Sequence, residues 1–103
     1  MVDNTRKKPF RVGNRVYFIK PSGVDVVKIG TSTQPWGRLA SLQTSHWENL
    51  SIIITIPGGL KKEKKLHKRF SKYRIRGEWF HLSPEIQEYI NDNVALSAKG
   101  QWK

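Results

Sequence analysis

The chain has 103 residues, the usual length of a single domain. Hydrophobic residues make up 37%, enough for one compact core, and the absence of cysteine excludes disulfide scaffolds, zinc fingers and thiol nucleophiles. Lys and Arg number 19 against 8 Asp and Glu, which gives a formal net charge of +11. No apolar stretch is long enough to span a membrane and no signal peptide is recognisable, so we expect a cytoplasmic protein.

Alternating strand and helix patterns predict one domain over residues 14–93, preceded by a flexible basic arm at 1–13 and followed by a frayed tail at 94–103. Strands are predicted where β-branched and aromatic residues cluster, and helices where apolar residues recur at helical spacing. The expected strands are 15–20, 25–30, 50–56 and 78–82, and the expected helices are 34–44, 60–72 and one that starts at Ser83-Pro84. This order predicts an α+β fold with a small, largely antiparallel sheet.

The first two strands are expected to form a hairpin around a turn at Pro21 to Gly23. If Lys20 pairs with Asp25, Tyr17 faces Lys28 across the hairpin. Alternation then places one apolar set on a common face of the sheet, namely Val16, Phe18, Val27 and Ile29. The apolar segment 50–56 has the composition of a buried central strand.

The positive charge is concentrated in one segment, and this distribution predicts a polyanionic partner, above all nucleic acid. Between residues 61 and 76 one acid, Glu63, lies among nine cations. We expect these cations to contact phosphates with little sequence specificity. They are Lys61, Lys62, Lys64, Lys65, Lys68, Arg69, Lys72, Arg74 and Arg76.

On a helical projection of 60–72, Glu63 falls on the inward apolar side with Leu66 and Phe70, opposite the cations. A carboxylate there must be paired, hydrogen-bonded or bound to a metal. Two interpretations stay open: Glu63 pairs with a core-facing cation and orders the fold, or it holds Mg²⁺ or Mn²⁺ on the floor of a basic groove.

His67 lies one turn after Glu63, and its pattern fits either a proton-handling group or a satisfied core histidine. The other two histidines, His46 and His81, are too scattered in sequence to propose a metal cluster. Trp36, Trp79 and Phe80 are candidates for base stacking, but Trp79 and Phe80 lie in a predicted strand, which favours core packing.

Several short motifs in a fixed order resemble the GIY-YIG nuclease superfamily, and most of all its phage-type DNA-binding subgroup. They are VYFIK, VVKIGTS, RLASLQT, EKKLHKRF and RGEWFHL, and the resemblance covers about residues 15 to 90. It implies a three-stranded antiparallel sheet flanked by helices, and hydrolysis of DNA that depends on one Mg²⁺ or Mn²⁺ ion. A bacterial or phage cytoplasmic setting is expected with it.

The resemblance also implies roles for individual residues. Tyr17 would act on or orient the attacking water, Arg38 would stabilise the phosphate, Glu63 would bind the metal, and Gly30 would close the second strand. The motifs depart from the family pattern at RVY and at KIG, where Lys28 replaces a tyrosine. An ammonium opposite Tyr17 would help that phenol lose its proton, so Lys28 is a catalytic candidate.

Three functions follow as hypotheses. The first is a small metal-dependent DNA endonuclease, and the second is a DNA-binding module of the same fold that has lost turnover through Lys28. The third is an RNA-binding basic protein, which would use contacts to the 2′-hydroxyl that DNA lacks. Target sequence, strand preference and oligomeric state do not follow from the sequence.

Overall fold

Five antiparallel strands form one sheet in the order β3-β1-β2-β5-β4. The structure, a computed structural model, describes residues 14–96. Its strands are β1 (Arg15–Pro21), β2 (Val26–Ser32), β3 (Leu50–Pro57), β4 (Arg74–Arg76) and β5 (Trp79–His81), and its helices are α1 (Pro35–Gln43), α2 (Leu60–Arg69), the short 3₁₀ helix η2 (Ser71–Tyr73) and α3 (Pro84–Leu96). The predicted α+β class is confirmed, but the predicted three strands are wrong, because β4 and β5 extend the sheet beyond β2.

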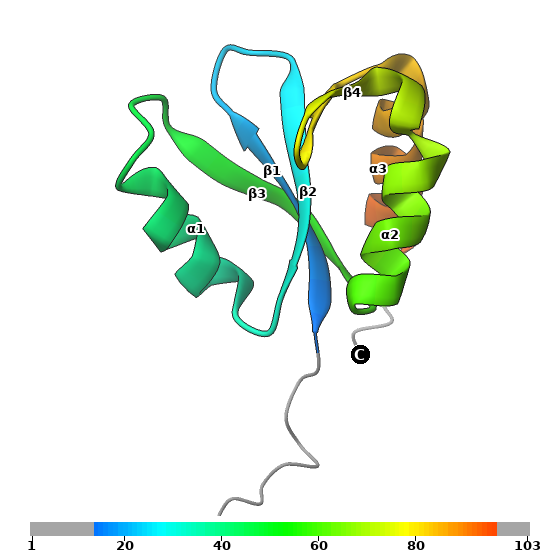
Figure 1. Cartoon of the computed structure of the whole chain (residues 1–103), viewed down its shortest axis with the longest axis horizontal. Coiled ribbons are helices and arrows are strands. Elements are labelled where there is room, and N and C mark those ends of the chain that lie inside the picture. Colours follow the sequence, from blue (N-terminus) through cyan, green and yellow to red (C-terminus); the bar gives the residue numbers. More distant parts are fainter. Residues whose placement is uncertain (1–13, 97–103) are drawn as a thin grey trace, which may run out of the picture.

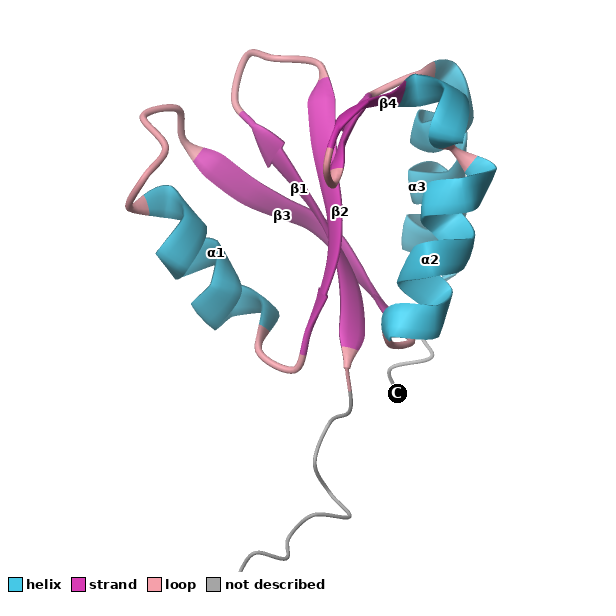
Figure 2. Cartoon of the chain, viewed as in Figure 1, coloured by secondary structure: helices cyan, strands magenta, loops and turns pink. Residues whose placement is uncertain are grey.

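Helices cover both faces of the sheet, α1 on one side and α2 with α3 on the other (Figures 1 and 2). The face toward α2 and α3 carries the main core, in which Val16 and Phe18 of β1 pack with Leu66, Phe70 and Ile86. The face toward α1 carries a smaller apolar cluster of Tyr17, Ile19 and Leu50, with three half-buried neighbours, Leu39, Leu42 and Ile52. Strand alternation sends successive β1 residues to opposite faces, so Tyr17 leaves the main core and lies on the side of α1.

The β1–β2 hairpin differs from its predicted register by two residues. Tyr17 pairs with Gly30, and Lys28 pairs with Ile19, so the prediction that Tyr17 faces Lys28 is wrong. The reason is that Pro21 still belongs to β1, where it pairs with Leu50 of β3. The turn therefore starts later and includes Gly23, whose φ of +77° suits glycine. The predicted division of side chains between the two faces is confirmed, because a shift of two residues preserves alternation.

The apolar strand β3 lies at an edge of the sheet, not at its centre as predicted. Its composition resembles that of a central strand because helices cover both of its faces. Ile53 and Ile54 pack against the main core, whereas Ile52 packs against the cluster under α1. The apolar composition of β3 therefore indicates that the strand is buried, but the burial comes from helices on its two faces rather than from neighbouring strands on both sides.

The basic segment 61–76 forms three elements in succession rather than one long helix. Helix α2 ends at Arg69, η2 follows, and β4 returns alongside β5. Helix α2 has the predicted inward side, since Glu63 and Leu66 are buried while the cations Lys61, Lys64, Lys65 and Lys68 are exposed.

Helix α3 begins at Pro84 as predicted, and it buries Ile86 and Ile90 against the main core with Tyr89 beside them. The helix continues to Leu96. The expected frayed tail at 94–103 therefore begins too early, because residues 94–96 belong to α3, and its remainder lies outside the described residues, as does the expected basic arm at 1–13. None of the helices within residues 14–96 is long and apolar enough to cross a membrane.

Candidate functional site

Tyr17 reaches from the middle of the sheet to the edge of β2 by passing over Gly30. Its side chain is 1% exposed. A Cβ added at Gly30 would lie 2.5 Å from Cζ of Tyr17 and 2.8 Å from Oε1 of Glu78, so both side chains occupy the space that glycine leaves. Glycine is needed here because the phenol crosses its strand partner at this close approach.

Arg38 extends from α1, where it is exposed, and its guanidinium lies beside the hydroxyl of Tyr17. Burial raises the pKa of Tyr17, and the nearby Glu78 carboxylate raises it further, although the neighbouring Arg38 guanidinium acts in the opposite direction. The Tyr17 hydroxyl in turn raises the pKa of Arg38. At neutral pH the Tyr17 phenol is therefore uncharged and lies beside the permanent positive charge of Arg38.

Glu63 enters from α2 and is 7% exposed. The Thr31 hydroxyl, next to Gly30 on β2, donates a hydrogen bond to Oε1 of Glu63. Oε2 lies 3.6 Å from Nε2 of His67. The predicted need for a partner is thus met inside the protein by the Thr31 hydroxyl, with the His67 ring close by.

Both ring nitrogens of His67 are hydrogen-bonded. Nε2 lies 2.8 Å from the carbonyl oxygen of Ile29, and Nδ1 lies 3.2 Å from an Nη of Arg74. A carbonyl only accepts and a guanidinium only donates, so Nε2 carries the proton and the ring is neutral in this arrangement. The ring also packs on Phe80, at 5.1 Å between centroids. His67 thereby connects α2 to β2 and β4, which is the arrangement of a satisfied core histidine.

Lys28 lies on the same sheet face as Tyr17 but has other partners. Its Nζ is 3.2 Å from Oε1 of Glu78 and 5.5 Å from the ring centroid of Trp79. The pKa of Tyr17 is raised, and Lys28 is not among the groups that shift it. Lys28 is therefore placed on Glu78 and Trp79 rather than opposite Tyr17, and its effect on the Tyr17 proton stays a prediction.

We call the polar groups at the end of β2 the Gly30 site. Tyr17, Lys28, Arg38 and Glu78 lie on the α1 side of the sheet near Gly30, and Glu63 approaches from α2 through its contact with Thr31, the next residue of β2. The site lies where β2 emerges between α1 and α2 (Figure 1). Strand β5 pairs with β2 only from Val26 to Lys28, so the last residues of β2 have no strand partner on that side within residues 14–96. The edge that carries the site is therefore not covered by a further strand.

The cations of segment 61–76 divide into two kinds. Those on the outer side of α2 project outward, whereas Arg69 and Arg74 pack on aromatic rings. Arg69 lies 5.1 Å from the ring centroids of Phe70 and Tyr89 and 3.8 Å from Glu85, and Arg74 lies 5.5 Å from Phe80. Part of this charge therefore stabilises the fold, and the outer side of α2 carries the cations best placed for a polyanion.

A family model described as the T5orf172 domain matches residues 14–95, nearly all of the folded chain. The chain belongs to the T5orf172 domain family. Membership indicates a DNA-binding or nuclease-like module, in agreement with the strong positive charge. No curated protein and no solved structure matches the chain.

The resemblance to the GIY-YIG nucleases is corrected by this match, because the T5orf172 family is a different one. The motifs that carried the resemblance are short, and both key motifs departed from the pattern, at RVY and at KIG. The resemblance therefore no longer supports the roles of Tyr17, Arg38 and Glu63. Any role for these residues depends on the geometry of the T5orf172 domain.

Sequence reasoning missed two members of this constellation, Thr31 and Glu78. The sequence pattern assigns no functional role to Thr31, and Glu78 enters it only as the first residue of the expected strand 78–82. An acid immediately after the basic run 61–76 was the available signal for Glu78. Its closeness to Tyr17 follows from the pairing of β5 with β2, which the sequence pattern does not specify.

Proposed function

We propose that this T5orf172 domain binds DNA along the outer side of α2 and hydrolyses a phosphodiester bond at the Gly30 site. The observation that carries the proposal is the buried Tyr17 phenol with the exposed Arg38 guanidinium beside it, close enough to Glu63 that the charge of this buried carboxylate also raises the pKa of Tyr17. A permanent cation, an oriented hydroxyl and a buried carboxylate are the groups that phosphoryl chemistry uses.

The binding step rests on charge. The formal net charge is +11, and α2 presents Lys61, Lys64, Lys65 and Lys68 outward next to the Gly30 site. Contacts to phosphate oxygens hold a duplex in register without reading its sequence. Binding of this kind weakens steeply as salt rises, because each neutralised phosphate releases counterions.

In the chemical step, Arg38 binds the non-bridging oxygens of the scissile phosphate, where its guanidinium stabilises the charge that develops during attack. Because burial raises its pKa, Tyr17 is neutral at physiological pH and cannot serve as a phenolate base. Its role is to orient the attacking water by hydrogen bonding. Attack by water forms a new P–O bond as the bond to the leaving nucleotide oxygen breaks. The attacking water gives up a proton to the solvent, and the leaving oxygen takes one up from the solvent.

Glu63 is the residue that would hold a metal ion. The described residues contain no group of three His, Asp or Glu side chains that could form a closed metal site. Mg²⁺ nevertheless binds through one or two carboxylates and several waters, so the donor set fits this ion better than zinc. When bound, Mg²⁺ or Mn²⁺ neutralises phosphate charge and activates water.

A second candidate is a DNA-binding module without turnover, and one observation favours it. Several groups of the Gly30 site already have partners, including Lys28 with Glu78 and Glu63 with Thr31. Such pairing also describes a site that orders the fold. A third candidate, an RNA-binding protein, rests on charge alone.

The test is nicking of supercoiled plasmid by the full chain with Mg²⁺ or Mn²⁺, with binding to DNA and to RNA of the same length measured in parallel. The variants are Glu63→Gln, which keeps an oxygen for Thr31, Arg38→Ala and Tyr17→Phe. Glu88→Gln is the matched control, because Glu88 is exposed on α3. We expect the three site variants to lose nicking by about a hundredfold or more and to keep most of their DNA affinity.

Each outcome assigns one function. Nicking by wild type and Glu88→Gln, lost in the site variants, supports hydrolysis at the Gly30 site. Tight DNA binding without nicking by any form contradicts hydrolysis and supports the binding module. Preference for RNA over DNA contradicts both and supports the third candidate.

A further inference from the structure

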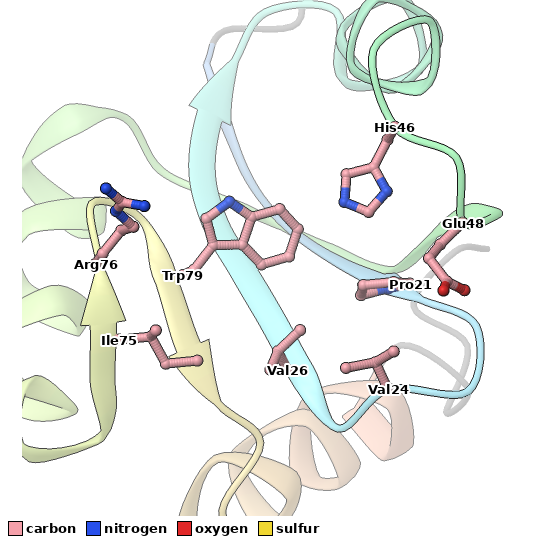
Figure 3. Close-up of a pocket in the computed structure, with 8 residues that line it drawn as sticks. All are labelled: Pro21, Val24, Val26, His46, Glu48, Ile75, Arg76 and Trp79. Atoms are coloured by element: carbon pink, nitrogen blue, oxygen red, sulfur yellow. The ribbon is translucent and has the colours of Figure 1, made fainter.

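A small pocket lies beside the Gly30 site, and no part of the proposed hydrolysis uses it. Its volume is about 250 Å³, and the rings of Trp79 and His46 lie near one another in it, with Val26 and Pro21 below them in the view (Figure 3). Val24 and Ile75 add apolar surface, while Arg76 and Glu48 lie at opposite sides. We propose that this pocket binds one unpaired nucleobase of the bound strand. The inference rests on the proposed function in taking DNA as the ligand.

The size and lining of the pocket suit a single flat ring system. Drug-sized ligands occupy pockets of roughly 300 Å³ and more, so this pocket takes a smaller group. Trp79 is half-buried in β5 and offers an indole surface to the pocket, and bases stack on such surfaces irrespective of their identity. The ring centroids of Trp79 and His46 are 6.0 Å apart, and the ring planes are inclined by 30°. This spacing leaves no room for a base between the two rings, so the base lies against them.

Polar groups at the rim match a base that carries an exocyclic amino group. The Glu48 carboxylate is an acceptor for such an amine, as in contacts of acidic side chains with cytosine. Nδ1 of His46 is buried and has no hydrogen-bond partner within residues 14–96. Because this atom is shielded from solvent, a base contacts the face of the His46 ring and takes its polar contact from Glu48.

Hydrogen bonds from the Gln43 side chain fix the position of the loop that carries His46 and Glu48. The side-chain amide of Gln43, at the end of α1, donates to the carbonyl oxygens of His46 at 3.0 Å and of Glu48 at 2.9 Å. Its Oε1 accepts from the backbone amide of Leu50 at 2.8 Å. This clamp pre-organises one wall of the pocket, which lowers the entropy lost when a ligand binds.

Lys28 connects the pocket to the Gly30 site. Its ammonium contacts Glu78 at 3.2 Å on the side of Tyr17, and it lies 5.5 Å from the ring centroid of Trp79 on the side of the pocket. A strand whose phosphate lies at the Gly30 site thus has a cation and an aromatic surface immediately beside it. A neighbouring base that leaves its stack enters the pocket, and Lys28 contacts the backbone between the two sites.

The test compares strands that differ only in their bases. Affinities of the full chain, in EDTA, are measured for labelled oligo(dC), oligo(dT) and an abasic strand with the same number of phosphates. Because contacts to phosphates contribute equally, the ratio of affinities isolates base binding. We expect wild type to prefer oligo(dC) over the abasic strand by about fivefold to a hundredfold.

Substitutions of Trp79 and Glu48 test whether this preference comes from the pocket, and Trp36→Ala is the control. Trp79→Ala should bring the ratio of oligo(dC) to abasic strand near one, while Trp79→Phe retains most of it. Glu48→Gln should remove the preference for oligo(dC) over oligo(dT) and leave the clamp intact, because Gln43 binds the backbone of Glu48 and not its side chain. Trp36→Ala, which removes an indole that is 63% exposed on α1, should leave both ratios unchanged. Circular dichroism checks that each variant is folded.

The outcomes separate this inference from the proposed function. If none of the single strands binds while plasmid DNA is still bound, the pocket inference fails and the proposed function stands, whereas loss of plasmid binding as well overturns the proposed function. If all bind equally to wild type, the pocket does not bind a base, although the DNA-binding function stands. An unchanged ratio in folded Trp79→Ala, or a ratio lost in Trp36→Ala, also overturns the inference, since base binding would then lie elsewhere.

Discussion

The two faces of the sheet are built for different purposes. The face toward α2 and α3 is a continuous apolar core whose largest members, Phe18, Phe70 and Phe80, are fully buried. The face toward α1 has a thin apolar cluster, and its largest buried side chain, Tyr17, ends in a hydroxyl beside the Arg38 guanidinium. The face toward α2 and α3 therefore supplies most of the stability, while the face toward α1 holds polar groups in fixed positions.

The largest expected difference between the faces is in the free energy of unfolding after loss of a leucine side chain. Leu66→Ala, on α2, removes a side chain that is 4% exposed and should destabilise the domain by about 2–5 kcal/mol. Leu39→Ala, on α1, removes a half-buried side chain and should cost about half as much. Guanidinium unfolding measures both. Equal losses would show that the α1 face contributes to stability as much as the main core.

The next effect concerns two glycines on the α1 side. Gly30→Ala places a methyl group on Tyr17 and Glu78 and should cost about 1–3 kcal/mol. It should also abolish any nicking, because the phenol must move. Gly37→Ala is the matched control, since its Cβ meets nothing closer than 3.6 Å and α1 gains helix propensity. We expect Gly37→Ala to stabilise the domain by roughly 0.5–1 kcal/mol, and a stable Gly30→Ala would contradict the close approach.

The smallest effect is a pH dependence that belongs to Tyr17. Its pKa is raised above 10.0 in the folded protein, so the folded state holds its proton at a pH where the unfolded chain has lost it. This contribution to stability is complete below about pH 10 and is lost as the pH rises through the folded pKa. The stability of Tyr17→Phe should therefore fall less steeply than that of wild type above about pH 10. Chemical unfolding at a series of alkaline pH values measures the two slopes, and identical slopes would contradict the raised pKa.

Much of the fold was predictable because local patterns specify it. Alternation in β1 and β2 assigned Phe18 and Tyr17 to opposite faces, and helical spacing placed Glu63 on the buried side of α2. The hairpin register was not predictable, because it depended on whether Pro21 ended the strand or paired with β3. That choice separated Tyr17 from Lys28 and placed it over Gly30 instead.

The sequence by itself determined the α+β class, the positive charge along α2 and the buried position of Glu63, because charge and periodicity are local properties. Only the tertiary structure decided that Arg38 meets Tyr17, that Glu78 holds Lys28, and that His46 and Trp79 share a pocket. These contacts join residues from different elements, and strand pairing and helix packing set their distances. No spacing within a single element specifies contacts of that kind.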